Sequence, residues 1–441
     1  MLLKTINIYD ILFFKRHWKE WLKMEINVLC DLIEQRKDEL FKLLGDLIRI
    51  NSENFGSYGK EKECAEYIHN LCLEMGLESD IYSPLDLEGF TEHPDYIDGR
   101  NLENRYNVVA RYRGENDVDE LMLMAHTDTV QIGDIKNWDM DPLSGEVVDG
   151  KIFGRGACDD KYGLATVLFI MKLLKENNVK LKSNLLFAAY SDEEYGGSHG
   201  ALASVLKYPS NRIISMDGVE NEIWHCASGG GEVKYLFHAS KTQDSAKLAA
   251  KAIPIVMDII NKFADNRQKE LEANPFYAGT IIPETSLRYM GVKAGNNGSD
   301  LDRGEVFFVF YTDKKKDEIY EEFDLLHNEI KEKLAPLGII GDGFVPNTRF
   351  FHYAYTQPDS EDIKLLLEAS METANKKLNV CGSCLSDLSV ISKYGSSKAF
   401  AFGAGIDFSK DGGAHQPNEH IGCKELLDYT KTIAGYILKV L

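Results

Sequence analysis

The sequence is short of positive charge: 50 Lys and Arg stand against 70 Asp and Glu, a formal net charge of −20. A protein this acidic repels nucleic acids and anionic membrane surfaces unless a local basic patch compensates. We find no such patch beyond residues 314–316, which we interpret as the solvated start of a helix. We therefore expect neither a nucleic acid nor a membrane among the partners.

Cysteine is sparse and irregular. Eight cysteines in 441 residues show no regular spacing, and a chain of this length does not need disulfides for stability. Cys381 and Cys384 form a lone C-x-x-C pair, which cannot by itself fill a tetrahedral zinc site. We interpret this pair as chance placement rather than a redox site, and we expect a reducing compartment, the cytoplasm.

Long apolar runs are also lacking. The apolar stretch 11–14 is followed at once by charged residues, so it is too short for a secretory signal or a membrane span. Met24 precedes a clean amphipathic stretch that includes Leu29 and Leu40. We interpret residues 1–23 as an N-terminal extension, either upstream of the true start or forming a loose helix.

Hydrophobic residues make up 44% of the chain and charged residues 27%, an ordinary globular balance. Apolar runs predict strands at 107–112, 121–125, 185–190 and 213–216, with a buried helix at 163–174. Strand, helix and strand in this order predict an α/β sheet with helices on its faces.

The pattern changes after the glycines at 229–231. Strands at 232–240 and 305–311 alternate with amphipathic helices at 245–266 and 317–334, which predicts a small sheet covered on one face. The earlier pattern of buried strands and helices returns with a helix at 360–378 and a strand at 398–402. We therefore expect a catalytic domain in two parts, 24–228 and 345–441, interrupted by a smaller domain at 229–344.

Imidazole and acidic side chains follow the predicted strands, at the ends where ligand sites gather in α/β sheets. In His126-Thr-Asp128, residues i and i+2 lie on one side of a strand. His126 can therefore bind a metal while Asp128 receives its other imidazole N–H. A surface histidine beside a strand end is the open alternative.

Asp159 and Asp160 stand side by side before the predicted helix at 163–174. Adjacent carboxylates repel each other unless a cation or a helix N-terminus compensates. Helix capping explains one of them but not both. We also expect a cis peptide bond between them, because Asp159 must point at the metals while Asp160 turns back into the protein.

Three further segments complete the set. Glu193 and Glu194 follow the strand at 185–190, so that one can bind metal while the other shuttles a proton; a solvated acidic loop is the alternative. Asp217 closes the strand at 213–216, and His415 lies in a glycine-rich loop. Histidines and carboxylates are ligands that zinc prefers, and a shared carboxylate with two further ligands per ion leaves room for a water.

In these segments the chain resembles the family of acetylornithine deacetylase, succinyl-diaminopimelate desuccinylase, carboxypeptidase G and the bacterial dinuclear-zinc dipeptidases, an aminoacylase and metallo-carboxypeptidase family. The resemblance covers about residue 40 to the C-terminus. The matching features are His126-Thr-Asp128, Trp138 with Asp141-Pro142, residues 154–161, Glu193-Glu194, Asp217, and His415 with Pro417-Asn418-Glu419.

The resemblance implies an α/β fold: a zinc-exopeptidase-like catalytic domain, with a mixed sheet and helices on both faces, interrupted by a smaller α+β lid. It implies two Zn²⁺, with Co²⁺ or Mn²⁺ as substitutes. The implied roles are His126 and Asp217 on one ion, Glu194 and His415 on the other, Asp159 bridging, Glu193 as general base and acid, and Asp128 orienting His126.

The implied activity is hydrolysis of an amide or peptide bond by a zinc-activated bridging water. A dipeptide, a C-terminal amino acid or an N-acyl amino acid would each serve as the small substrate, and the sequence leaves that choice open. The alternative is a catalytically silent binding protein on the same scaffold. Five metal-binding side chains together with Glu193 argue against silence.

The inserted domain departs from the family pattern. His238-Ala-Ser240 is present, but residues 241–245 differ, and the strand that often ends Asp-x-Arg ends here in Phe310-Tyr-Thr312. The family's lid histidine donates to the oxyanion, often in a partner subunit. The resemblance therefore implies that His238 contacts substrate in a homodimer formed through the lid; His225, His352 and a plain surface role for His238 are the alternatives.

Overall fold

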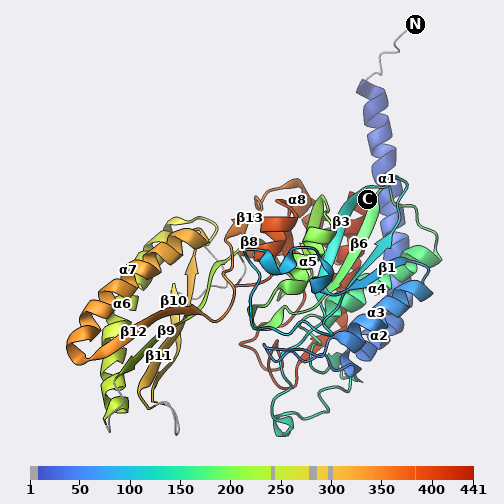
Figure 1. Ribbon diagram of the computed structural model, residues 1–441. Coiled ribbons are helices and arrows are strands. Elements are labelled where there is room, and N and C mark those ends of the chain that lie inside the picture. The colour runs from blue at the N-terminus through green and yellow to red at the C-terminus, as the bar shows by residue number, and fades with distance from the viewer. Residues whose placement is uncertain (1–7, 240–243, 278–285, 296–300, 383) are drawn as a thin grey trace.

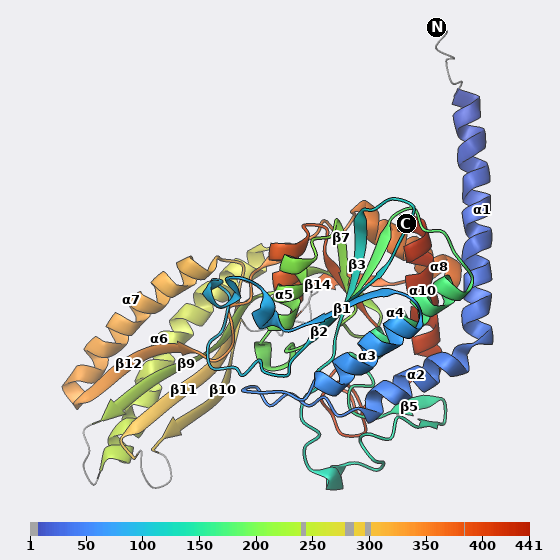
Figure 2. The same ribbon diagram turned by 45° about the vertical axis from the view of Figure 1, so that its right-hand side comes forward.

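The computed structural model describes residues 8–239, 244–277, 286–295, 301–382 and 384–441 (Figure 1). A large α/β body and a smaller body of one sheet and two helices lie side by side in both ribbon views (Figure 2). We call the smaller body the lid.

The large sheet has nine strands in the order β1-β2-β6-β3-β7-β15-β8-β13, with β14 also paired to β8. The central strands β6, β3, β7 and β15 are parallel, whereas β1, β2 and β8 join by antiparallel pairs, so the sheet is mixed. The bounds are β1 Glu78–Tyr82, β2 Asn107–Tyr112, β3 Asp119–His126, β6 Asn184–Tyr190, β7 Arg212–Ser215, β8 Glu222–Ala227, β13 Ala354–Tyr355, β14 Asn379–Gly382 and β15 Phe400–Gly403.

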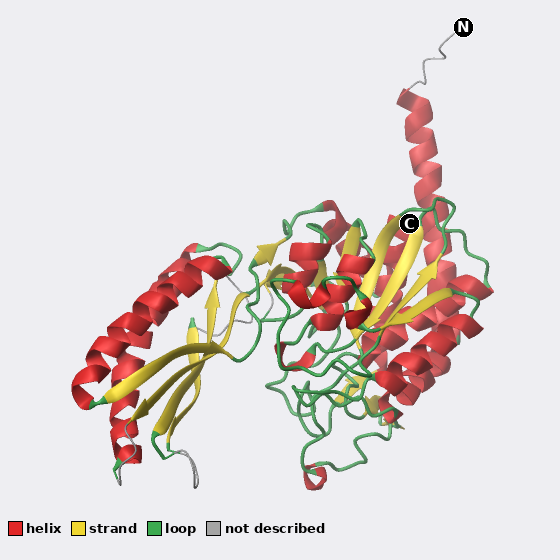
Figure 3. Cartoon of the chain, in the orientation of Figure 1, coloured by secondary structure: helices red, strands yellow, loops and turns green. Residues whose placement is uncertain are grey.

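Helices cover both faces of this sheet, because both faces are apolar (Figure 3). Along β3, Leu121 and Leu123 pack on one side and Met122 and Met124 on the other. The first side is covered by α1 Ile8–Gln35, α2 Lys37–Arg49, α3 Lys62–Glu74, α4 Lys161–Glu176, α8 Glu361–Thr373 and α10 Cys423–Val440. The second side is covered by α5 His199–Lys207 and α9 Leu388–Val390.

A three-stranded sheet of β4 Val147–Val148, β5 Lys151–Phe153 and β16 His420–Gly422 lies beside the main sheet. It pairs His420 with Phe153. The segment that carries Asp159 and the loop that carries His415 are thereby held next to each other.

The lid is a four-stranded antiparallel sheet in the order β10-β11-β9-β12. Val233, Phe237 and Phe308 pack against its helices on one face, so among the described residues no helix covers the opposite, helix-free face. The bounds are β9 Gly229–Ala239, α6 Ser245–Ala273, β10 Leu287–Ala294, β11 Arg303–Thr312, α7 Lys316–Leu334 and β12 Ile339–Pro346.

The fold class predicted from the sequence is confirmed, although several elements were not predicted, among them β1, β8, β13 and β14 of the large sheet. The sequence analysis missed β10 and β12, because neither strand shows a regular alternation of apolar and polar residues. β10 is almost wholly exposed, and the pairing of β12 with β9 is interrupted between Gly341 and Gly343. The helix predicted at 360–378 ends at Thr373, since Asn375 takes a left-handed φ of 50°. Ser240, the predicted end of a lid strand, lies outside the described residues.

The N-terminal helix does not break at Met24. α1 runs continuously from Ile8, and its first turns project away from the rest of the body (Figure 2), while Leu29 and Ile33 are buried in the core. The proposed extension 1–23 therefore continues into a structural helix, with residues 1–7 outside the described part. Among the described helices, none is both long and apolar enough to cross a membrane.

Candidate metal centre

The candidate site is built from segments that follow the four parallel strands. His126 is the last residue of β3, Glu193 and Glu194 follow β6, Asp217 follows β7, and His415 lies beyond β15. Because these strands run in the same direction, their carboxyl ends meet at one edge of the sheet. Residues far apart in sequence are thus brought together.

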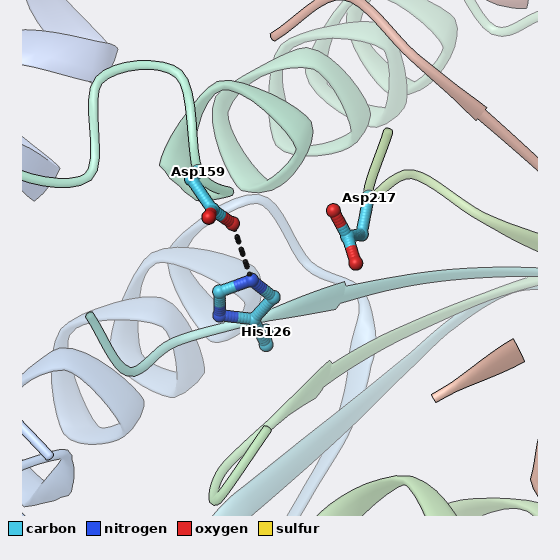
Figure 4. A group of neighbouring side chains, drawn as sticks. All are labelled: His126, Asp159 and Asp217. Atoms are coloured by element: carbon cyan, nitrogen blue, oxygen red, sulfur yellow. Dashed lines mark hydrogen bonds and ion pairs between the residues drawn. The ribbon is translucent and has the colours of Figure 1, made fainter. Parts of the chain in front are cut away.

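The first group consists of His126, Asp159 and Asp217, whose side chains converge in Figure 4. His126 Nε2 lies 2.9 Å from Asp159 Oδ1. One donor atom from each of the three residues lies within 4.8 Å of the others, a spacing that fits ligation of one ion.

The second group consists of Asp159, Glu194 and His415. His415 Nε2 lies 3.0 Å from Asp159 Oδ2 and 3.2 Å from Glu194 Oε2. Glu194 Oε1 accepts the Val130 N–H at 2.9 Å, which leaves Oε2 facing the histidine. The two oxygens of Asp159 therefore face the two histidines, as expected of a carboxylate shared by two ions.

The peptide bond between Asp159 and Asp160 is cis, as predicted. Asp160 is fully buried, and burial raises the pKa of its carboxyl well above the usual range. Only Asp159 of the adjacent pair takes part in the two donor groups.

Asp128 differs from its predicted contact. His126 Nδ1 donates to the main-chain carbonyl of Asp128 at 2.9 Å, while the nearest carboxylate oxygen is 3.8 Å away. The carboxylate instead accepts the N–H groups of Glu193 and Glu194 at 3.1 and 2.9 Å. The tautomer of His126 is thus set as expected, with Nε2 left for a metal, but the main chain sets it.

The sequence analysis missed the residues that hold this loop from behind. Asn54 Nδ2 donates to Asp128 Oδ2 at 2.8 Å and to the carbonyl of Glu194 at 3.2 Å. Arg100 Nη1 lies 2.8 Å from Asp192 Oδ1. Asp192 belongs to the acidic segment that we had noted, but nothing in the local sequence marks Asn54 or Arg100, because their partners are 74 and 92 residues away.

The electrostatics of the cluster call for positive charge. Burial, followed by the charge of Asp159, raises the pKa of Asp217 to about 7. The charge of Glu194 raises the pKa of His415 to about 12. Without a metal, protons on the Asp217 carboxyl and the His415 imidazole therefore supply the positive charge that bound metal ions would provide. Two imidazoles and three carboxylates, with Asp159 shared, give each ion three protein ligands and leave a position open, so these residues fit a dinuclear metal site.

Glu193 stands apart from both donor groups yet lines the same cavity as Asp159 and Asp217. Burial, with the nearby charge of Asp387 adding to it, raises the pKa of the Glu193 carboxyl well above its ordinary value. A carboxyl that is not a ligand, and holds a proton readily, is suited to proton transfer.

The cavity has a volume of about 820 Å³ and lies between the metal-binding edge and the lid. The catalytic body contributes Trp224, Cys384 and Ser386 to its wall, and the lid contributes Arg288 and Tyr311. This volume accommodates a small ligand.

The histidines considered as oxyanion donors are not brought to this cavity. Among the described lining residues, His415 is the only histidine. His238 Nδ1 bonds to Asp342 at 2.8 Å, His225 to the Thr356 carbonyl at 2.9 Å, and His352 to Asp95 at 2.7 Å. A role for His238 in a partner's site remains a prediction.

A family model described as peptidase family M20/M25/M40 matches residues 122–439. The chain belongs to this family. It is accordingly a metal-dependent hydrolase that acts on C–N bonds, with the catalytic body and smaller lid that the sequence predicted.

Relatives of this peptidase family match from about half to nearly all of the chain. An uncharacterized metallohydrolase of Methanocaldococcus jannaschii is 28% identical over 430 residues, covering 90% of this chain and 97% of that protein. A succinyl-diaminopimelate desuccinylase of Blochmanniella floridana is 29% identical over 210 residues, covering 44% of this chain and 52% of that protein. A di-peptidase of Saccharomyces cerevisiae shares the fold, with a TM-score of 0.71, 14% identity and coverage of 94% and 98% of the two chains.

Proposed function

We propose that this protein is a two-zinc hydrolase that cleaves the amide or peptide bond of a small substrate. The observation that carries the proposal is that Asp159 belongs to both donor groups while Glu193, in neither, lines the same cavity. His126 and Asp217 bind one ion, Glu194 and His415 bind the other, and Asp159 binds both.

Glu193 acts as general base and then as general acid. A pair of zinc ions, when bound, supplies a water of lowered pKa and polarises the scissile carbonyl. Glu193 takes the proton of the attacking water and returns it to the leaving nitrogen. The burial that raises the pKa of Glu193 supports this double role, since the group must hold the proton between the two transfers.

The substrate is a dipeptide, a peptide that loses its C-terminal amino acid, or an N-acyl amino acid. The cavity volume of about 820 Å³ supports a small molecule. The names of a desuccinylase and a di-peptidase among similar proteins support this range. A catalytically silent binding protein is not favoured. Such a protein would need the metal-binding side chains but not a further carboxyl, Glu193, that lines the cavity without belonging to either donor group.

We also propose that the protein forms a homodimer through the lid. The edge strand β10 leaves Met290 and Val292 about half exposed, at 46% each, and an exposed strand edge is a ready pairing surface. In such a dimer, His238 of one subunit serves the site of the other.

The test is metal analysis combined with a hydrolysis assay on dipeptides and N-acyl amino acids. We expect two zinc ions per chain, loss of turnover with a chelator, and recovery with Zn²⁺, Co²⁺ or Mn²⁺. Metal-loaded protein that binds these compounds without hydrolysing them would favour the silent binding protein. Binding of a single ion would contradict the shared role of Asp159.

A further inference from the structure

Asp95 lies in a loop of the catalytic body that precedes β2, and its side chain is only 2% exposed. Its Oδ2 lies 2.7 Å from His352 Nε2 and accepts the Tyr394 hydroxyl at 2.8 Å. Lys316 Nζ lies 3.6 Å from Oδ1, and Lys393 Nζ lies 3.7 Å from Oδ2. Burying a charge is costly unless it is paired, so these contacts hold one another in place. We call Asp95, Lys316, His352 and Tyr394 the Asp95 clasp.

The members of the Asp95 clasp come from both bodies. Lys316 is the first residue of the lid helix α7, and its Nζ also donates to the Pro94 carbonyl at 3.0 Å. His352 lies in the connection that returns from the lid strand β12 to β13, and Tyr394 belongs to the catalytic body. One buried carboxylate thus ties the start of a lid helix, together with the returning connection, to the catalytic body.

The Asp95 clasp also lies close to the lid's part of the cavity wall. Val309 and Tyr311 of β11 line the cavity. The strand ends at Thr312, and α7 begins shortly afterwards, at Lys316. A contact that fixes the start of α7 therefore also limits where Val309 and Tyr311 can lie.

The loop that carries Asp95 continues into the cavity wall on the catalytic side. Residues 97–100 line the cavity. Arg100 Nη1 lies 2.8 Å from Asp192 Oδ1, and Asp192 directly precedes Glu193. One end of this loop therefore contacts the lid, and the other end holds the segment that carries the proposed general base.

His199 makes a second link between this loop and Asp192. The Ile97 N–H donates to His199 Nε2 at 3.1 Å, and His199 Nδ1 donates to Asp192 Oδ2 at 2.6 Å. His199 is fully buried, so its ring has little room to move. A contiguous set of contacts thus connects Asp95 with Asp192.

We infer that Asp95 is a positioning residue that seats the lid against the loop behind Glu193. The inference goes beyond the proposed function, because it concerns how the two walls of the cavity are held together. Asp95 belongs to neither metal-binding group and is not among the described residues that line the cavity. It acts through Lys316 on the lid wall and through residues 97–100 on the catalytic wall.

The test compares Lys316→Gln with Lys316→Arg in the zinc-loaded full chain. In Lys316→Gln, amide hydrogen exchange should become faster in residues 94–100 and in the first turn of α7, because the cation that joins them is lost. Lys316→Arg should restore slow exchange. The kcat/KM for the best dipeptide or N-acyl amino acid should fall about 3- to 5-fold in Lys316→Gln with zinc content unchanged, a modest loss because the side chain is 33% exposed and solvent screens it.

Lys315→Gln is the matched control. Lys315 is the neighbouring residue, is exposed and carries the same charge, so its loss should change neither the exchange of residues 94–100 nor kcat/KM. Asp95→Asn removes the centre of the clasp, and kcat/KM should fall about 10- to 100-fold, the range for charged hydrogen bonds. In that background Lys316→Gln should have little further effect, since the losses of two groups in one contact do not add.

Lys316→Glu gives a second test if Asp95→Asn does not fold. It places an anion opposite Asp95, so its effect should exceed that of Lys316→Gln. Unchanged exchange of residues 94–100 in both variants overturns the inference, as does a lower kcat/KM without faster exchange, or an equal effect of Lys315→Gln. Exchange reports on the clasp whether or not the compounds are hydrolysed, so failure of the proposed function is seen separately, as zinc-loaded protein without turnover.

Discussion

The carboxylate of Asp128 holds the main chain of Glu193. Its Oδ1 accepts the Glu193 N–H at 3.1 Å, and its Oδ2 accepts that of Glu194 at 2.9 Å. One side chain thus holds the main chain of both the proposed general base and the proposed neighbouring ligand. The contact to His126 comes from the Asp128 carbonyl, which any substitution of the side chain retains.

Because the carbonyl of Asp128 contacts His126 while its carboxylate contacts Glu193 and Glu194, the effect of Asp128→Asn can be predicted. The side-chain amide of asparagine has only one oxygen that can accept a hydrogen bond. The N–H of either Glu193 or Glu194 therefore loses its partner, at a cost of about 1–3 kcal/mol in stability. We expect kcat to fall about 10- to 100-fold with zinc content nearly unchanged. The exposed Asp134→Asn is the control. Zinc loss as severe as in His126→Ala would show that the carboxylate orients the imidazole after all.

Glu193→Gln and Glu194→Gln form a matched pair. We expect Glu193→Gln to lower kcat by at least about 10²–10⁴-fold, the value of general acid–base catalysis, while zinc content stays near that of the unmodified protein. Glu194→Gln should lose zinc, because it replaces a proposed ligand whose Oε2 lies 3.2 Å from His415 Nε2. Equal zinc loss in both variants would show that the roles of this pair are misassigned.

Metal removal should make stability depend on pH. Without metal, folded Asp217 keeps its proton up to about pH 7, against an ordinary value of 3.8. The folded state then binds more protons than the unfolded state, so stability falls as pH rises between these values. His415, raised from 6.5 to about 12, continues the fall above pH 7.

Urea unfolding from pH 4 to 9, with and without chelator, measures this effect. The zinc-loaded protein should show a flatter curve, since bound cations replace the protons. Asp217→Asn should reduce the metal-free slope below about pH 7, to which Glu61 also contributes because burial raises the pKa of its carboxyl to about 8. Parallel curves for the metal-free and zinc-loaded proteins would contradict a cluster that requires cations.

The sequence predicted those parts of the molecule that local pattern determines. The strand at 107–112 was placed to the residue, and α4 within two residues at each end, because buried runs flanked by polar turns are unambiguous. Four of the five ligands could be proposed because they end or follow parallel strands, whose ends meet at one edge, whereas Asp159 stood out as one of two adjacent carboxylates before α4. Edge strands such as β10 lack this pattern, since packing on one face does not constrain them.

Contacts between distant segments could not be predicted in the same way. Asn54 reaches Asp128 across 74 residues, and Arg288 enters the cavity only through the register of β10 on β11. Such residues carry no local signal. The order of chemical groups along the chain pointed to the candidate metal centre, whereas the lid's part of the cavity wall depends on how its strands are registered.

The last prediction concerns His238, which lies on the helix-free face of the lid. Asp342 accepts from its Nδ1 at 2.8 Å and orients the ring, whose side chain is 36% exposed. If His238 donates to the oxyanion of a partner's site, His238→Ala should lower kcat about 10²–10³-fold, with little change in KM or zinc. His327→Ala, a lid histidine bonded to Tyr235, is the control.

Mixing two inactive variants tests whether the histidine acts across subunits. A heterodimer of Glu193→Gln and His238→Ala pairs one intact Glu193 with the intact His238 of the other subunit, so activity should return after the subunits exchange. Light scattering should show a dimer throughout. A fully active monomer would contradict the lid dimer. A near-normal kcat in His238→Ala would show that another group donates to the oxyanion, and His225 would be the next candidate. If activity stays absent in mixed dimers although each single variant is inactive, His238 acts within its own chain, which requires the lid to move its strand β9 toward the cavity.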